Sequence, residues 1–255
     1  MESVLDRVIK HNTENVNLLK TKDYNIFSVF QIQSKEVLIC RMIADLLNPR
    51  GQHGAGAEYL KIFLRDCLGM EKMDTKLADQ AIVTAEYPID AERRIDIVIE
   101  IGSHFLPIEV KIYAADQKSQ CFDYYQYAKR RDAQAKVYYL TLDGHRPGKD
   151  STSSGSQSVP EEDIVCLSFR EHILNWLKAC KNCRNTGMIP ILEQFIHNIE
   201  QISGYTSEKV RNMVIDELLK SGYSLRAGMQ IADSINAAKA KLIYLVFEEF
   251  EKQLA

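Results

Sequence analysis

The chain lacks the long apolar segments and the glycine motifs that mark several large protein classes. Its apolar runs fall well short of the roughly 18 residues that a membrane-spanning helix needs. Its first residues, MESVLDRVIKHNTENV, lack the hydrophobic segment of a secretory signal peptide. No Walker loop, GxGxxG fingerprint or Gly-x-Ser-x-Gly elbow is present. We therefore expect a cytoplasmic protein without a dinucleotide site or a serine-hydrolase elbow.

An excess of positive charge is also missing. The 32 lysines and arginines are outnumbered by 35 acidic residues, which gives a formal net charge of −3. This balance argues mildly against a general nucleic-acid coating protein, which would be basic. A local basic strip is still compatible with it, and the candidates are Arg93, Arg94, Lys118 and Lys129-Arg130-Arg131. Ordinary solvated surface charge is the alternative interpretation of each of them.

The six cysteines do not form a recognisable disulfide or zinc framework. They are scattered at positions 40, 67, 121, 166, 180 and 183, mostly within apolar patterns. Cys180 and Cys183 have zinc-like spacing, but no second Cys pair or His pair follows them. Reduced thiols in the core are therefore the favoured interpretation.

What is abundant is apolar sequence interrupted by a few acids. With 255 residues and 45% apolar content, the chain can form one moderate domain, with or without a helical appendage. Residues 94–101 and 106–112 are rich in Ile and Val and therefore predict two strands. Gly102-Ser103 between them suits a two-residue hairpin turn, with glycine supplying the positive φ.

The predicted hairpin brings charged residues together on one face. If Gly102-Ser103 is the turn, paired residues have numbers that sum to 205, so Asp96 lies opposite Glu109. Side chains alternate along a strand, so Glu109 and Lys111 share that face. The other face is continuously aliphatic and consists of Ile95, Ile97, Ile99, Ile101, Ile108, Val110 and Ile112. Opposed carboxylates repel unless a cation lies between them, and a divalent ion with oxygen ligands such as Mg²⁺ fits the pair.

This constellation resembles the PD-(D/E)XK nuclease superfamily, which has the restriction-endonuclease-like fold. The motif is Ile95-Asp96 followed by Glu109-Val110-Lys111, with Ile95 in place of the usual proline. Gln120 and Tyr124 match the Gln-xxx-Tyr element of several branches, on the helix after the lysine strand. Upstream, Ser34-Lys-Glu36 opens a helix, as in a bacterial branch in which a helix Glu joins the metal site. The resemblance covers residues 34–127 and extends more loosely to near 180.

The resemblance implies a role for each matched residue. Asp96, Glu109, Glu36 and the backbone carbonyl of Val110 would ligate Mg²⁺, with Mn²⁺ as a substitute. Lys111 would neighbour the scissile phosphate and orient or deprotonate water, or stabilise developing charge. Gln120 would orient Lys111 or the phosphate, and Tyr124 would support Gln120. The alternatives are an Asp96–Lys111 salt bridge and an ordinary helix surface at Gln120 and Tyr124.

The rest of the chain predicts an α/β fold with extra helices at both ends. The order is helices at 2–20, 25–30, 34–47 and 57–68, strands at 81–89, 94–101 and 106–112, a helix at 116–131 capped by Asp116, strands at 136–142 and 163–167, and a helix to about 180. This is the αβββαβ core of the resembled superfamily, with a mixed sheet. We expect a core domain over residues 1–185, with a mobile loop at 143–162, and a helical extension over 186–255 that packs on the core.

The functional expectation is a Mg²⁺-dependent nuclease that cuts DNA, in phage defence or DNA processing. A catalytically silent nucleic-acid-binding or assembly subunit with the same fold is the alternative, and an RNA nuclease is a third interpretation. Strandedness, sequence specificity and polarity of cleavage stay open, and so does a homodimer. His53, in the loop at 51–56, is expected to structure that loop, with a phosphate contact as the alternative.

Overall fold

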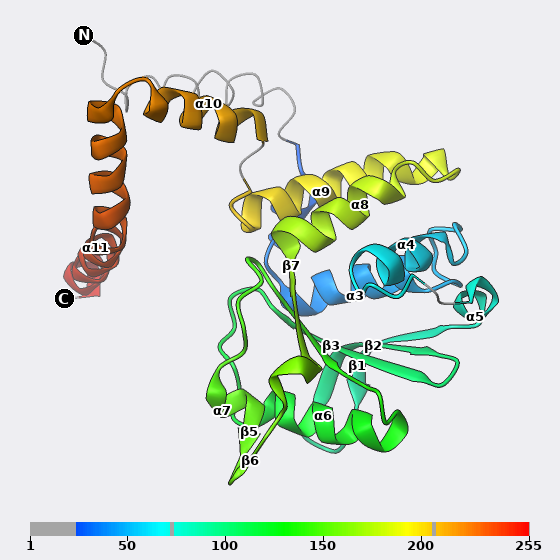
Figure 1. Ribbon diagram of the computed structural model, residues 1–255. Helices are drawn as coiled ribbons and strands as arrows, with labels where there is room; N and C mark the ends of the chain where they lie inside the picture. The colour runs from blue at the N-terminus through cyan, green and yellow to red at the C-terminus, as the bar shows by residue number, and fades with distance from the viewer. Residues whose placement is uncertain (1–23, 72–73, 206–207, 255) are drawn as a thin grey trace. The chain divides into compact units, whose positions relative to one another are not determined.

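The computed structural model describes residues 24–71, 74–205 and 208–254 (Figure 1). The chain divides into two compact units, one spanning Tyr24–Tyr205 and the other containing the described residues 208–254. The helix expected at residues 2–20 lies outside the described residues. No helix in the described part of the chain is both long and apolar enough to cross a membrane.

A five-stranded mixed sheet forms the centre of the Tyr24–Tyr205 unit. Its strands lie in the order β1 (Ile82–Pro88), β2 (Arg94–Ile101), β3 (His104–Lys111), β4 (Val137–Thr141) and β7 (Ile164–Ser168). The pairs β1–β2 and β2–β3 are antiparallel, whereas β3–β4 and β4–β7 are parallel. This arrangement confirms the predicted α/β class with a restriction-endonuclease-like core.

Helices surround this sheet, and further helices follow it. Those before it are α2 (Ile26–Val29), α3 (Glu36–Leu47), α4 (Glu58–Asp66) and α5 (Thr75–Asp79). Between and after the strands come α6 (Gln120–Arg131), α7 (Lys149–Thr152), η1 (Glu161–Asp163), η2 (Phe169–Ile173), α8 (Leu174–Cys180), η3 (Thr186–Met188) and α9 (Ile189–Ile202). The second unit contains α10 (Glu208–Leu219) and α11 (Gly222–Leu254).

The sheet has a different helical cover on each face (Figure 1). The larger apolar cluster joins α3, α4, α8 and α9 to one face through residues such as Ile43, Phe63 and Trp176. The smaller cluster joins α6 to the other face through residues such as Cys121 and Tyr139. Burial of these faces supplies the main stabilisation of the layers, at about 25 cal/mol per Å² of apolar surface.

The predicted β2–β3 hairpin is confirmed, including its register. The pairs run from Ile97 opposite Ile108 to Ile101 opposite His104, and each sums to 205. Gly102 has φ +59°, a conformation in which a side chain is strained. A Cβ there would also lie 3.3 Å from Leu77 Cδ1. The turn therefore fixes which residues of β2 and β3 face each other.

Two local expectations were wrong, and a stretch expected to be a mobile loop contains short elements. Ile95 was expected on the same face as Ile97, but it packs with Val98 in the smaller cluster, on the face that α6 covers. Regular alternation breaks at the start of β2, where Glu86 on the neighbouring strand adopts φ +52°. The helix at 116–131 begins only at Gln120, and Ser119 rather than Asp116 precedes it. The 143–162 stretch is not structureless, since it contains α7, η1 and a small hairpin of β5 (Ser153–Ser154) and β6 (Gln157–Ser158).

The compact unit also extends further than the predicted core. It ends at Tyr205 and so includes α9, which we expected to begin the helical extension. Phe195 on α9 stacks on Phe27 of α2, with ring centroids 5.4 Å apart. Contacts of this kind tie α9 to the sheet-containing unit.

Candidate active site

Glu109 and Lys111 lie buried at the carboxyl end of β3. Their strand position places both on the sheet face that α6 covers, together with Phe105 and the β4 neighbour Tyr139. Glu109 is only 1% exposed and Lys111 7%. Lys111 Nζ lies 2.6 Å from Glu109 Oε1. Glu109 Oε1 is thus paired with the ammonium group, whereas its Oε2 has no hydrogen-bond partner among the described residues.

Asp96 is positioned where the pairing between β2 and β3 ends. The last ladder pair at this end is Ile97 with Ile108, so Asp96 lies just beyond the β2–β3 ladder. Its Oδ2 instead accepts a hydrogen bond from the backbone N–H of Val110, at 2.8 Å. The half-buried Asp96 carboxylate is thereby fixed beside the Glu-x-Lys segment, as the predicted hairpin requires.

Glu36 reaches the same place from the opposite layer. It is the first residue of α3, a helix whose residues Ile39, Cys40, Ile43 and Leu47 are buried. Glu36 Oε2 accepts a hydrogen bond of 2.8 Å from the backbone N–H of Ile112, directly after β3. The structure therefore brings Glu36, Asp96, Glu109 and Lys111 together at one end of one strand.

The electrostatics of this cluster show an excess of buried negative charge. Burial, reinforced by the Asp96 charge, raises the pKa of Glu109 well above its usual range. Burial also raises the pKa of Asp96, although the Val110 N–H opposes that rise. At Lys111 burial lowers the pKa, but the charges of Glu109, Asp96 and Glu36 together outweigh burial, and the net pKa is raised. One ammonium group thus faces three carboxylates.

The donor set fits a divalent cation with oxygen ligands. Glu109 has buried oxygens short of donors, and leaving a charged acceptor unsatisfied is costly unless a ligand compensates. Carboxylate oxygens are the ligands that Mg²⁺ and Mn²⁺ prefer. In the described ranges no three His, Cys, Asp or Glu side chains already form a group that could hold a metal ion.

Gln120 and Tyr124 form a buried pair at the start of α6. Gln120 Nε2 donates to the Tyr124 hydroxyl at 3.1 Å, and that hydroxyl donates to the backbone carbonyl of Arg94 at 2.5 Å. Their i, i+4 spacing therefore places them on one buried face, not on the helix surface. Through Arg94 the pair is linked to the strand that carries Asp96.

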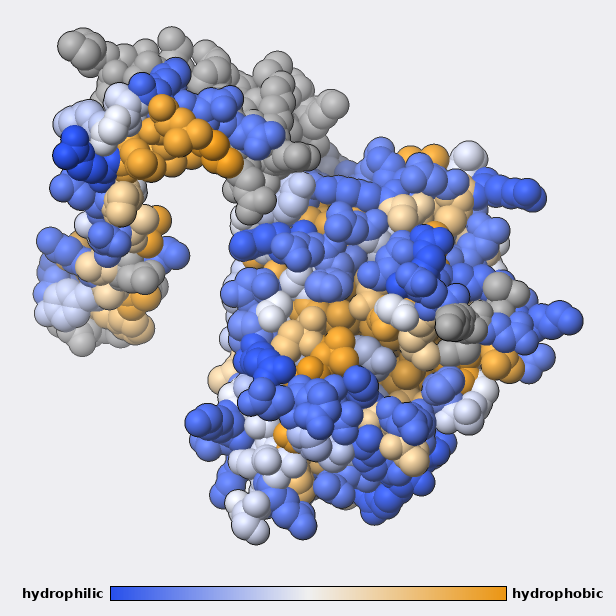
Figure 2. Space-filling model, viewed as in Figure 1, coloured by the Kyte–Doolittle hydropathy of each residue, from blue (hydrophilic) through white to orange (hydrophobic). Residues whose placement is uncertain are grey.

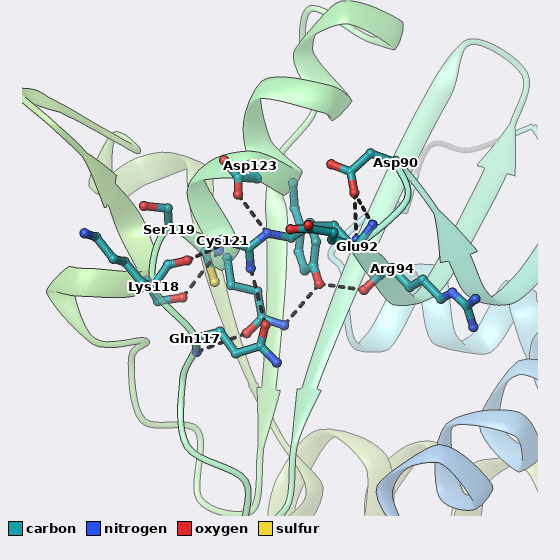
Figure 3. Close-up of polar contacts among 12 residues, drawn as sticks. Asp90, Glu92, Arg94, Gln117, Lys118, Ser119, Cys121 and Asp123 are labelled. Atoms are coloured by element: carbon teal, nitrogen blue, oxygen red, sulfur yellow. Dashed lines mark hydrogen bonds and ion pairs between the residues drawn. The ribbon is translucent and has the colours of Figure 1, made fainter.

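Most of the candidate basic strip is engaged within the protein. Arg93 is ion-paired with Asp123 at 2.9 Å and donates to the Lys118 carbonyl. Figure 3 labels both partners, Lys118 just before α6 and Asp123 on it. Lys129 pairs with Asp163 at 3.2 Å. Arg131 pairs with Glu100 at 2.5 Å. These contacts agree with ordinary surface roles for the paired residues, while Arg94 and Lys118 are exposed.

His53 structures its loop, as expected. Its Nδ1 accepts from the Ala55 N–H at 3.1 Å, so Nε2 carries the proton and faces the Asn48 carbonyl at 3.0 Å. The ring also stacks on Tyr59. All six cysteines are free thiols, including Cys180 and Cys183.

The sequence interpretation missed several polar residues beside this site. Tyr139 pairs with Glu109 in the ladder, and its hydroxyl donates to Asp116 at 2.6 Å. Asp116 also accepts from the Gly148 N–H at 2.7 Å, which explains why it is not a helix cap. The sequence feature that could have revealed these residues is the polar run after β4. Parallel strands end at the same edge of a sheet, so this run lies beside the end of β3.

Comparison with known proteins gives one match. Residues 24–197 match a family model described as the PD-(D/E)XK nuclease superfamily, over more than half of the chain. No curated protein and no solved structure gives a match.

Proposed function

Because the chain belongs to the PD-(D/E)XK nuclease superfamily, we propose that it is a metal-dependent nuclease that hydrolyses phosphodiester bonds in DNA. The observation that carries this proposal is the buried Glu109 carboxylate, which lies beside Asp96, pairs with Lys111 through Oε1 and leaves Oε2 without a hydrogen-bond partner among the described residues. A buried carboxylate with a perturbed pKa next to a second acid is typical of functional sites.

In this proposal Asp96, Glu109 and Glu36 would hold Mg²⁺, together with the backbone carbonyl of Val110, and Mn²⁺ would substitute. A bound divalent cation supplies Lewis acidity, which offsets phosphate charge and makes a bound water more acidic. Two of these residues are already fixed to the end of β3, since Asp96 binds the Val110 N–H and Glu36 binds the Ile112 N–H. Such preorganisation lowers the reorganisation that binding requires.

Lys111 would act on the substrate phosphate. It is held as an ammonium group by its ion pair with Glu109, and an ammonium donates hydrogen bonds to non-bridging phosphate oxygens. This favours stabilisation of developing charge over deprotonation of water. Gln120 would orient Lys111 or the phosphate, and Tyr124 would hold Gln120 in place through its bond to the Arg94 carbonyl.

The finer parts of the proposal rest on analogy with the superfamily. DNA is the proposed substrate in preference to RNA, and phage defence or DNA processing in the cytoplasm is the proposed setting. Catalysis would belong to the unit that spans Tyr24–Tyr205, with α10 and α11 as a separate helical extension. A homodimer would suit cleavage of both strands at symmetric sites.

The test is cleavage of circular and linear DNA, and of RNA, with Mg²⁺, Mn²⁺ or EDTA. We expect wild type to cleave DNA only with the metal, and Asp96→Ala and Lys111→Ala to lose at least about 100-fold in rate, because each removes charge from the reacting centre. Lys61→Ala and Asp79→Ala are matched controls, since these two form an exposed ion pair of 2.8 Å on α4 and α5.

The control variants should cleave as wild type does. Cleavage that persists in EDTA or in both site variants would contradict the assignment. A folded wild type that binds DNA and cuts neither DNA nor RNA would indicate a silent binding subunit instead. Faster cleavage of RNA than of DNA would overturn the assignment of DNA as the substrate.

A further inference from the structure

The loop after β4 lies at the same sheet edge as the proposed site. Strands β3 and β4 are parallel, and Lys111 at the end of β3 pairs with Thr141 at the end of β4. The chain that leaves Thr141 therefore starts one strand spacing, about 4.8 Å, from the strand that carries Lys111. Loops at the carboxyl ends of parallel strands are where open α/β sheets bind ligands.

The first turn of this loop is held in a defined conformation. The Gly144 N–H donates to Thr141 Oγ1 at 2.8 Å. Gly144 has φ +84°, and a Cβ there would lie 3.2 Å from the Cβ of Ser168. A side chain is therefore disfavoured at Gly144, both by its conformation and by its neighbour. The residues on either side, Asp143 and His145, are consequently positioned by the turn.

Asp143 and His145 form a polarised pair. His145 Nδ1 lies 2.6 Å from Asp143 Oδ1, and the His145 backbone N–H donates to the same oxygen at 3.3 Å. Because a carboxylate only accepts hydrogen bonds, Nδ1 carries the proton. No hydrogen bond or ion pair within the described chain engages His145 Nε2, and the side chain is 60% exposed. The ring thus offers one free nitrogen to solvent.

The ring is also linked to the proposed site through Tyr139. Its centroid is 6.3 Å from that of Tyr139, in an edge-on arrangement. Tyr139 is the ladder partner of Glu109. The free nitrogen therefore belongs to the surroundings of Glu109 and Lys111, unlike the nitrogens of the buried His53, both of which are used within their loop.

We propose that His145, oriented by Asp143, is a further substrate-binding residue whose Nε2 contacts a phosphate oxygen of the nucleic acid next to Lys111. This inference rests on the proposed nuclease function. An imidazolium donates from both nitrogens, and a ring held between the Asp143 carboxylate and a phosphate has an anion for each donor. Asp143 acts through His145 and is a positioning residue.

The test compares His145→Ala and Asp143→Asn with wild type. Initial rates on DNA with Mg²⁺ give kcat and KM, and fluorescence anisotropy of labelled DNA with Ca²⁺ in place of Mg²⁺ gives Kd. His145→Ala should raise both KM and Kd about 10-fold, the loss expected for one charge-assisted hydrogen bond, and change kcat by less than about twofold. Asp143→Asn should raise KM and Kd by about threefold.

The matched control is His104→Ala. His104 Nδ1 also faces an aspartate, Asp132, at 3.5 Å, but it lies at the opposite end of β3 from Lys111. This variant should keep the wild-type KM and Kd. Melting temperatures of all three variants establish that each is folded, and the exposure of His145 predicts no loss there.

The outcomes separate this inference from the proposed function. Wild-type KM and Kd in His145→Ala, with Lys111→Ala inactive, would overturn the role of His145 and leave the nuclease intact. A fall in kcat alone would also overturn a binding role. If wild type cleaves nothing, the proposed function fails. The Kd values of wild type and His145→Ala then still show whether His145 contacts the nucleic acid. A wild type that binds no nucleic acid would overturn both.

Discussion

At the scale of a single residue, the free-energy cost of the site lies in the burial of the Glu109 carboxylate. Its carboxylate is almost fully buried, its Oε2 has no hydrogen-bond partner among the described residues, and its Lys111 partner must also balance Asp96. An uncompensated buried charge destabilises a fold by several kcal/mol, on the order of 3–5. Residues this costly are found where function requires them, so the arrangement is suited to a cation rather than to stability.

Glu36 combines a structural contact with a proposed metal ligand, and two substitutions separate them. Glu36→Ala removes the acceptor of the buried Ile112 N–H and should lower the free energy of unfolding by about 1–2 kcal/mol. Glu36→Gln keeps an acceptor oxygen, so the unfolding free energy should stay within about 0.5 kcal/mol of wild type. Both variants remove the negative charge and should lose at least about 10-fold in cleavage rate.

Urea denaturation and initial rates measure the two effects of Glu36. Full activity in Glu36→Gln would show that the carboxylate serves only the fold. Equal destabilisation by Gln and Ala would show that the Ile112 contact depends on charge.

At the scale of elements, the sequence predicted the hairpin that carries the site. The aliphatic runs of β2 and β3 and the intervening glycine were enough to give the register. They could not reveal how Asp96 is held, because that residue lies beyond the last β2–β3 pair and bonds the Val110 N–H with its side chain. Regular alternation also placed Ile95 on the wrong face.

The start of α6 shows a second limit of sequence reasoning. Asp116 has the side chain of a helix cap, but its carboxylate is used by Tyr139 and by the Gly148 N–H, far along the chain. The helix begins four residues later, at Gln120. Local propensity cannot anticipate a competition with a partner 32 residues away. The contacts of Asp116 with Tyr139 and Gly148 also hold the polar run after β4 beside the site.

The junction between β7 and α8 predicts a sensitivity to acid. His172 Nδ1 accepts a hydrogen bond of 3.1 Å from the Ser168 N–H, which requires an unprotonated nitrogen. Burial lowers the pKa of His172 below its usual 6.5, although Glu171 opposes this. Its contribution to stability is therefore complete above about pH 6.5 and is lost as the pH falls through the lowered pKa.

His172→Asn keeps an acceptor near the δ position and removes the titration. Its unfolding free energy should fall less than that of wild type between pH 7 and pH 5, by about 1 kcal/mol for a pKa difference of one unit. Urea denaturation at each pH gives the two slopes. Identical slopes would show that His172 does not contribute to the acid response.

At the scale of the whole molecule, the boundary between units was the least predictable feature. The sequence is helical in pattern from residue 189 onward, so periodicity alone does not separate α9 from α10. The difference lies in burial. Leu192, Phe195 and Ile199 of α9 are buried, whereas Leu242, Ile243 and Tyr244 of α11 are exposed. Figure 2 shows apolar residues gathered along one side of α10.

The overall charge of −3 agrees with the proposed site, which would bind a cation before it binds a polyanion. Glu36, Asp96 and Glu109 all lie in the Tyr24–Tyr205 unit, within the 24–197 range that matches the superfamily. Binding of a divalent ion there should therefore stabilise the folded chain. The free energy gained is about 2.7 kcal/mol when the ion is present at 100 times its dissociation constant.

The most direct measurement is the melting temperature of the full chain with and without Mg²⁺ or Mn²⁺, for wild type, Glu109→Gln and Asp79→Asn. We predict that saturating metal raises the melting temperature of wild type by about 5–10 °C. Asp79→Asn, at an exposed acid, should show the same rise. Glu109→Gln should show none and, without metal, should be at least as stable as wild type, because the buried charge is gone. An unchanged wild type, or an equal rise in Glu109→Gln, would contradict the metal site.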